Sequence, residues 1–236
     1  MGRAFEYRKA RKLKRWGHMA RTFTRIGKEI EMAVKASGPD PASNLRLRLL
    51  IATAKSESMP KDNVERAIKR AISKDSTDYK EVVYDGKGPH GIAVVVETAT
   101  DNPTRTVANL RAAFVRGKGE IGTMGMNDFL FERKCSFDVT WKEGTDMDNL
   151  ELELIDFDID EVFRDEDSIM IYADFKSYGP ISKYLEDNNF EIKSFKFERI
   201  PVTMRELSPE EQEDVNGLLE RLENDDDVVN VFHNMA

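Results

Sequence analysis

The chain has 236 residues, with 44 acidic and 36 basic side chains and a net charge of −8. This length allows one large domain or two to three small ones and is enough to bury a core. No segment has the roughly 18 consecutive apolar residues of a membrane-spanning helix, and the first residues lack an apolar signal region. The single cysteine, Cys135, excludes an internal disulfide and fits a reducing cytoplasm. We therefore expect a folded cytoplasmic protein.

The charges are divided unevenly along the chain. Residues 1–74 carry 19 basic and 7 acidic side chains, a net charge of +12, whereas residues 75–236 carry 17 and 37, a net charge of −20. A basic segment attracts a polyanion and an acidic segment repels it. Nucleic acid is therefore the leading candidate partner. An Arg-rich start would also suit a mitochondrial presequence, but helical sequence begins almost at once.

The basic segment has the periodicity of successive helices. Between residues 19 and 36, apolar side chains recur on one helical face, and cations share the opposite face: Arg21, Arg25, Lys28 and Lys35. Residues 44–57 are apolar nearly all round, as in a central buried helix. Pro60 opens a third helix, which turns its cations away from the core: Arg66, Lys69 and Arg70. We expect residues 1–74 to form a helical domain with cationic outer faces.

Beyond residue 78, the pattern changes to strands and helices. Strands are expected over 81–85 and 92–98, followed by a helix that Asn102 caps. Near the end of the chain, Ser208 and Glu211 form a capping box before a helix, and a strand follows over 228–232. Residues 79–135 contain too few strands and helices for a complete α/β domain, whereas residues 204–236 contain one helix and one strand that belong to no other predicted unit. We therefore expect one discontinuous α/β domain made of residues 79–135 plus 204–236.

The intervening residues, 136–203, have the order strand, helix, strand, strand, helix, strand. This order is the ferredoxin-like βαββαβ motif. Its elements are expected at these positions: 136–141, 146–157, 159–164, 168–173, 178–188 and 192–200. A separate short strand is expected at Phe129–Phe131. The predicted fold class is α+β, with an N-terminal helical domain followed by two small α/β domains, one inserted in the other.

No pattern in the chain indicates an active site, so we expect a non-enzymatic protein without a cofactor or metal. Gly86–Gly91 and Gly117–Gly122 match G-x-G-x-x-G, but the first lies between two predicted strands and the second follows a predicted helix. Neither has the strand before and helix after that a phosphate site needs, so hairpin or loop glycines are the better interpretation. The histidines and Cys135 have no metal-ligand spacing. The acidic run at 156–167 lacks the central glycine and final glutamate of an EF-hand, and a solvated hairpin is favoured.

The candidate nucleic-acid-binding residues are the cations of the first 74 residues. One basic helix is often only a solvated surface, but three successive basic stretches beside an acidic body favour polyanion binding. Phosphate contact is favoured over base recognition, because no recognition helix or RNP signature is present. The candidates are Arg8, Lys9, Arg11, Lys12, Lys14, Arg15, Arg21, Arg25, Lys28, Arg46, Arg48, Lys61, Arg66, Lys69 and Arg70.

Two blocks of this region, 44–49 (NLRLRL) and 59–70 (MPKDNVERAIKR), resemble the YebC family, which includes mitochondrial translational activators of cytochrome oxidase subunit I. The match continues at 100–107, at Gly122-Thr123 and at 131–134. The resemblance implies a helical domain plus two α/β domains, one inserted in the other. It also implies a cytoplasmic regulator of gene expression, since family members are described as DNA-binding transcriptional regulators and others act on ribosomes.

These observations favour a DNA-binding transcriptional regulator that places its basic helices on the phosphate backbone. A translation factor associated with ribosomal RNA is the first alternative, because the charge pattern suits either polyanion. A second alternative is an adaptor whose acidic α/β domains bind a basic protein partner. No membrane contact is expected, and the oligomeric state is left open.

Overall fold

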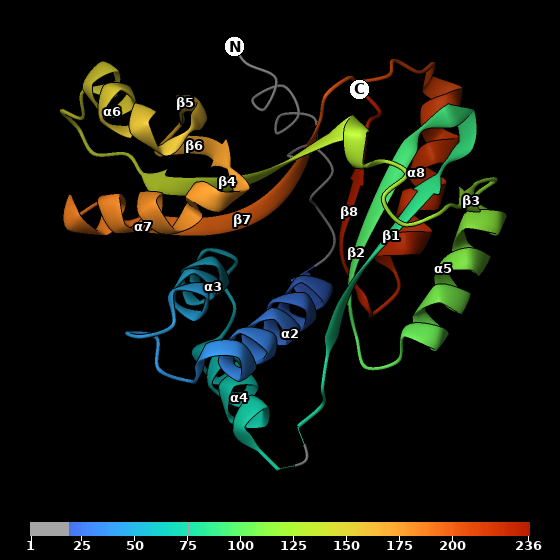
Figure 1. Cartoon of the computed structure of the whole chain (residues 1–236), viewed down its shortest axis with the longest axis horizontal. Coiled ribbons are helices and arrows are strands. Elements are labelled where there is room, and N and C mark those ends of the chain that lie inside the picture. The colour runs from blue at the N-terminus through green and yellow to red at the C-terminus, as the bar shows by residue number, and fades with distance from the viewer. Residues whose placement is uncertain (1–18, 75) are drawn as a thin grey trace.

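The structure, a computed structural model, describes residues 19–74 and 76–236 (Figure 1). It has the α+β class expected from the sequence, with a helical head followed by two four-stranded sheets and their helices. All pairings within the two sheets are antiparallel. One sheet lies between parts of the other in the chain, so one α/β unit is inserted in the other. The fold-class prediction is confirmed, and the residue boundaries of the domains stay predictions.

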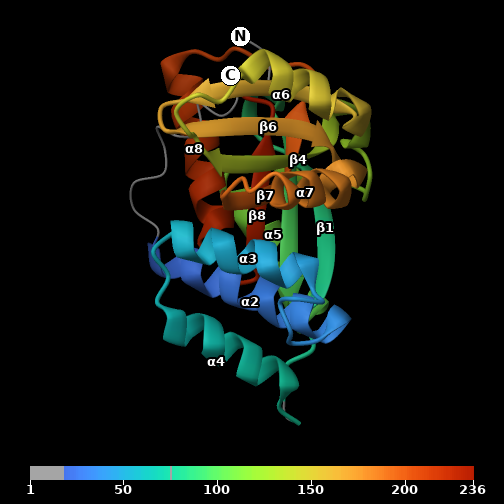
Figure 2. The same cartoon turned by 90° about the vertical axis from the view of Figure 1, so that its left-hand side faces the viewer.

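The head consists of α2 (Met19–Ser37), α3 (Leu45–Ser56) and α4 (Lys61–Ile72). Their apolar faces enclose a core in which Ile30 and Ala67 are fully buried. The Asn44 side chain joins the start of α3 to α2, because it accepts from the Leu47 amide at 3.0 Å and donates to the Ala33 carbonyl at 2.8 Å. Figure 2 shows α4 as the outermost layer, with α2 and α3 between it and the rest of the molecule.

The first sheet has the order β3-β1-β2-β8, with α5 and α8 packed over it. Its elements are β1 (Lys80–Lys87), β2 (Ala93–Thr100), α5 (Pro103–Arg116), β3 (Glu120–Ile121), α8 (Pro209–Glu223) and β8 (Val228–His233). Asn102 caps α5 through the Arg105 amide at 3.1 Å, and Ser208 and Glu211 form the reciprocal capping box that begins α8. Both caps agree with the sequence prediction. The last strand of the chain completes this sheet.

The inserted sheet has the order β5-β6-β4-β7, with α6 and α7 over one face. Its elements are β4 (Phe131–Thr140), α6 (Met147–Leu154), β5 (Ile159–Asp165), β6 (Ser168–Asp174), α7 (Tyr178–Asp187) and β7 (Ile192–Pro201). The separate strand expected at Phe129–Phe131 is wrong, because Asp128–Leu130 forms a short 3-10 helix. β4 is one ten-residue strand, so the strand expected at 136–141 is confirmed over 136–140 but begins earlier, at Phe131. The cause is β7, which pairs with β4 from Phe131 to Val139 and keeps the charged residues between them extended.

The central helix α3 belongs to two cores. Leu47 packs into the head, whereas Leu49 packs into the core of the inserted unit. The Thr53 hydroxyl meets β7, accepting from the Phe195 amide at 3.0 Å and lying 3.2 Å from the Phe195 carbonyl. This helix therefore fixes the head against the inserted unit, as its apolar pattern predicts. None of the helices in residues 19–74 and 76–236 has the length and apolarity needed to cross a membrane.

Candidate nucleic-acid interface

The structure divides the predicted cations into three groups. The N-terminal six lie outside the described residues: Arg8, Lys9, Arg11, Lys12, Lys14 and Arg15. A second group, on α2 and α3, contacts the body of the molecule: Arg25, Lys28, Arg46 and Arg48. A third group is exposed on the outermost helix, α4: Lys61, Arg66, Lys69 and Arg70. The remaining candidate, Arg21, is half-buried on α2.

Lys28 lies in a buried junction between the head and the first sheet. Its ammonium group pairs with Asp227 at 3.1 Å and donates to the carbonyls of Ala99 at 3.1 Å and Asp226 at 2.7 Å. It also lies 5.1 Å from the centre of the Tyr79 ring. All of its strong contacts are internal, so Lys28 cannot meet an external phosphate without breaking the junction.

Asp227 is the centre of this junction. Besides Lys28, its carboxylate accepts from Arg105 at 2.6 Å, Thr106 at 2.9 Å and Thr100 at 3.1 Å. Burial alone would raise the pKa of Asp227, but the hydrogen bonds from Arg105, Thr106 and Lys28 outweigh it and lower the pKa to about 2. The carboxylate is therefore ionised throughout the physiological pH range and holds the head on the body.

The other cations of this second group also connect parts of the molecule. Arg25 donates to the Glu223 carbonyl at 3.0 Å, Arg46 pairs with Glu81 at 2.8 Å, and Arg48 pairs with Glu186 at 2.9 Å. The predicted outward orientation of the α2 cations is therefore wrong for Arg25 and Lys28. The cations of α2 do share one helical face, but that face meets the acidic body at Arg25 and Lys28, and ion pairs between the head and the body neutralise part of the charge division.

The cations of α4 form the exposed surface, which we call the α4 face: Lys61, Arg66, Lys69 and Arg70. The α4 helix buries Val64, Ala67 and Ala71 on its other side, which leaves these cations in solvent. Asp62 and Glu65 interrupt the charge, and Glu65 lies 3.7 Å from Lys61. Among the described residues, Lys69 makes no ion pair or side-chain hydrogen bond, so its ammonium group is available to an anion.

Arg70 has an internal role as well. Its guanidinium, whose side chain is 65% exposed, pairs with the buried carboxylate of Glu31 on α2 at 2.8 Å. Burial raises the pKa of Glu31, and the adjacent Arg70 opposes this rise. Arg70 therefore supports the packing of α4 on α2 while much of its side chain remains in solvent.

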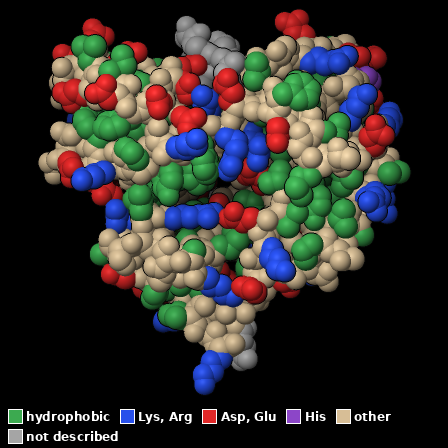
Figure 3. All heavy atoms as spheres, viewed as in Figure 1, with side chains coloured by type: hydrophobic (Ala, Val, Ile, Leu, Met, Phe, Trp, Pro, Cys, Tyr) green, Lys and Arg blue, Asp and Glu red, His purple; other side chains and the backbone are tan. Residues whose placement is uncertain are grey.

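The sequence interpretation missed Lys74, which follows α4 and is exposed, although its charge could have placed it with the other cations. Lys55, at the end of α3, is also exposed and lies 3.8 Å from Glu191. Basic and acidic side chains alternate around the hollow in the centre of the face shown in Figure 3. The side of the molecule shown in Figure 3 therefore has no continuous cationic surface. The clearest group of exposed cations on one described helix is the α4 face.

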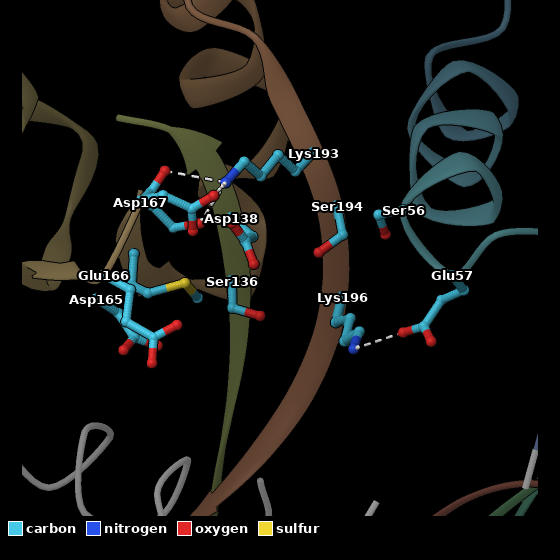
Figure 4. Close-up of a pocket in the computed structure, with 12 residues that line it drawn as sticks. Ser56, Glu57, Ser136, Asp138, Asp165, Glu166, Asp167, Lys193, Ser194 and Lys196 are labelled. Carbon is cyan, nitrogen blue, oxygen red and sulfur yellow. Dashed lines mark hydrogen bonds and ion pairs between the residues drawn. The ribbon is translucent and has the colours of Figure 1, made fainter. Parts of the chain in front are cut away.

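A hollow of about 360 Å³ lies between the end of α3 and the inserted sheet (Figure 4). Its acidic side chains outnumber its two lysines: Glu57, Asp138, Asp165, Glu166 and Asp167. Lys193 pairs with Asp167 at 3.1 Å and Lys196 with Glu57 at 3.7 Å. This lining repels a phosphate. The described residues contain no group of His, Cys, Asp and Glu side chains arranged to hold a metal ion.

The glycines of the two G-x-G-x-x-G matches have packing roles. A Cβ atom on Gly86 would lie 2.4 Å from the Phe114 ring, and one on Gly117 would lie 2.7 Å from the Leu218 side chain. The first motif connects β1 to β2 and the second leads from α5 into β3. Neither precedes a helix that could hold a phosphate, in agreement with the sequence interpretation.

Comparison with known proteins identifies the family. Residues 3–74 match the family described as the TACO1/YebC protein N-terminal domain, and residues 79–235 match the TACO1/YebC second and third domain. The chain is similar to a solved structure of a conserved hypothetical protein from Aquifex aeolicus, with a TM-score of 0.77 and 31% identity over 94% of this chain and 91% of that one.

Its sequence relatives carry one common description. A protein from Bacteroides fragilis is 60% identical, covering 100% of this chain and 96% of its own, and one from Parabacteroides distasonis is 58% identical, covering 100% and 97%. Each is named a probable transcriptional regulatory protein. Family matches over both parts of the sequence and relatives of this identity agree with the resemblance found in the sequence. The chain belongs to the TACO1/YebC family.

Proposed function

We propose that this protein is a non-enzymatic, cytoplasmic regulator of gene expression that binds nucleic acid through the phosphate contacts of its α4 face. The observation that carries the proposal is the position of this helix. The α4 face is cationic, exposed and outermost in the molecule, whereas Lys28, Arg46 and Arg48 of α2 and α3 are paired with carboxylates of the body. The names of the relatives support the regulatory part of the proposal.

The arrangement favours backbone contact over base recognition. Lys61, Arg66, Lys69 and Arg70 follow the solvent side of a 12-residue helix. Lysine and arginine at these positions neutralise phosphates and release counterions, a contribution that does not depend on base sequence. The acidic body repels the same polyanion and so confines contact to the head. Affinity should therefore fall steeply with salt, by about 0.7–0.9 log units per tenfold salt for each phosphate neutralised.

The test compares two charge reversals of equal size. Arg66→Glu/Lys69→Glu changes the α4 face but keeps Arg70, which Glu31 requires as a partner. Lys176→Glu/Lys183→Glu makes the same change in net charge at exposed positions of the inserted unit. Fluorescence anisotropy with a labelled DNA duplex and a labelled ribosomal RNA fragment gives the affinity and its salt dependence.

The α4 variant should bind at least about tenfold more weakly, with a salt slope shallower by about 1.4–1.8 units, because two phosphate contacts are lost. The control should retain the slope of the wild type. Equal behaviour of the two variants would refute the α4 face as the interface.

The same variants distinguish the two polyanions when ribosomes are sedimented at physiological salt. Association with ribosomes that the α4 reversal abolishes, together with weak duplex binding, would select the translation-factor alternative over the transcriptional one. If the protein binds neither polyanion but retains a basic protein partner, the adaptor alternative replaces the proposal.

A further inference from the structure

Two exposed helical stripes on this chain have the same residue spacing and opposite charge. The first is on α5, at Ala108, Arg111, Ala112, Val115 and Arg116. The second runs along α6 into the following turn (Ile155–Phe157), at Asp148, Glu151, Leu152, Ile155 and Asp156. Counted from the first residue of each stripe, the others follow at +3, +4, +7 and +8. Charges stand at +3 and +8 in both, and apolar side chains at +4 and +7.

The α5 stripe is apolar at its centre and cationic at its edges. Val115 is 68% exposed, and the five residues line an open depression of about 420 Å³. Neither Arg111 nor Arg116 has an ion pair with any described residue, although neighbouring Arg105 pairs with Asp101 and Asp227. Arginines that make no ion pair within the chain are available to a partner, and arginine is enriched in protein interfaces.

The α6 stripe has the complementary composition. Leu152 and Ile155 are 68% and 63% exposed, while Leu150 and Leu154 on the other side of the helix are buried. Among the described residues, no cation pairs with Asp148, Glu151 or Asp156. Two large exposed aliphatic side chains bordered by acids are the features of a helix that packs against a basic apolar surface.

We propose that the α5 stripe of one molecule binds the α6 stripe of a second copy of the same chain. When the helices run antiparallel, the common spacing sets Ala112 against Ile155 and Val115 against Leu152 along the centre of the contact. Arg111 and Glu151 then lie on one flank of the contact, and Arg116 and Asp156 lie on the other. The small alanine side chains of α5 let the larger aliphatic side chains of α6 approach its backbone. Opposite charges then border an apolar centre, which is the usual arrangement of a protein interface.

The partner is a second molecule because the two stripes cannot meet within one chain. α5 belongs to the first sheet and α6 to the inserted unit, and they lie toward opposite ends of the long axis (Figure 1). A contact between two different surfaces is heterologous, so it builds rings or chains. A pair of short helices buries less than a standard interface of about 1,600 Å², so the association is weak and concentration-dependent. It requires no nucleic acid.

Sedimentation velocity of the full chain, from about 1 to about 300 µM, tests the contact across the range expected for a weak interface. The wild type should show a sedimentation coefficient that rises with concentration. Arg111→Glu/Arg116→Glu and Glu151→Arg/Asp156→Arg should each remain monomeric, because each puts like charges face to face. All four positions are exposed, so both variants should fold, as circular dichroism will verify.

Mixing gives the decisive result. In an equimolar mixture, the acidic α5 stripe of the first variant can bind the basic α6 stripe of the second. The native α5 stripe of the second variant can bind the native α6 stripe of the first, so association should return. The chain that carries all four substitutions should also associate with itself, while Lys176→Glu/Lys183→Glu should behave as the wild type. A wild type that stays monomeric throughout, or variants whose mixture remains monomeric, would overturn the proposal.

Discussion

Asp227→Asn should detach the head from the body, because this carboxylate is the centre of the buried junction. The substitution keeps the shape of the side chain but removes the negative charge opposite Lys28 and Arg105. The Asp227 side chain is only 7% exposed, so water can replace little of the lost interaction. Lys28, which is also buried, would remain as a charge without a carboxylate partner.

Two arguments give the expected loss of unfolding free energy for Asp227→Asn. Removing one partner of a buried ion pair typically costs about 3–5 kcal/mol. The lowering of the Asp227 pKa from 3.8 to about 2 corresponds to about 2 kcal/mol. Because the folded pKa lies below the unfolded one, this stabilisation is present above about pH 4 and is lost as the pH falls toward 2. We therefore expect a loss of about 2–4 kcal/mol at pH 7 that shrinks in acid.

Urea unfolding followed by circular dichroism measures the free energy, and hydrogen exchange of the α2 amides reports whether the head detaches first. Asp78→Asn is the matched control, because Asp78 pairs with Lys35 at 3.3 Å but is 86% exposed. Its cost should be below about 0.5 kcal/mol. A loss below about 1 kcal/mol for Asp227→Asn, or α2 exchange unchanged from the wild type, would refute the reasoning.

Three further predictions concern groups that are half-buried or buried. Burial raises the pKa of Glu29 to about 7 against the opposing charge of Arg46, so stability should fall as the pH rises from about 4.5 through 7. Glu29→Gln should reduce this slope in urea unfolding and leave the smaller part that comes from Glu31, whose pKa is also raised. A slope equal to that of the wild type would contradict the assignment. Burial also raises the pKa of Cys135 to about 12, so native protein at pH 8 should not react with a thiol reagent until it unfolds. Thr53→Val leaves the buried Phe195 amide without its acceptor and should cost about 1–3 kcal/mol in thermal unfolding, whereas an unchanged melting temperature would exclude this tie between α3 and β7.

The fold could be predicted because its signals are local. The Asn102 cap, the Ser208–Glu211 capping box and the order of strands and helices each depend on residues within one segment. The inserted unit followed from counting elements, since the first sheet needed a strand that only the tail could supply. β4 was misjudged because its continuity depends on pairing with β7, about 60 residues further along the chain.

The junction could not be predicted, because its signals are distant in the sequence. Lys28 looks like any exposed helical cation until the fold brings Asp227 to within 3.1 Å across 199 residues. Arg46 and Arg48 are similar, because their carboxylate partners, Glu81 and Glu186, lie in other parts of the fold. By contrast, the exposed cations of α4 followed from helical spacing alone, since the apolar positions of that helix assign its solvent side.

Lysine footprinting tests directly whether the α4 face contacts the nucleic acid. The protein is acetylated with and without a saturating DNA duplex or ribosomal RNA fragment, and mass spectrometry gives the modification of each lysine. Lys61, Lys69 and Lys74, all exposed on or beside α4, should be strongly protected, with no change at the exposed Lys176 and Lys183 of the inserted unit. Unprotected α4 lysines in a saturated complex would contradict the proposed interface.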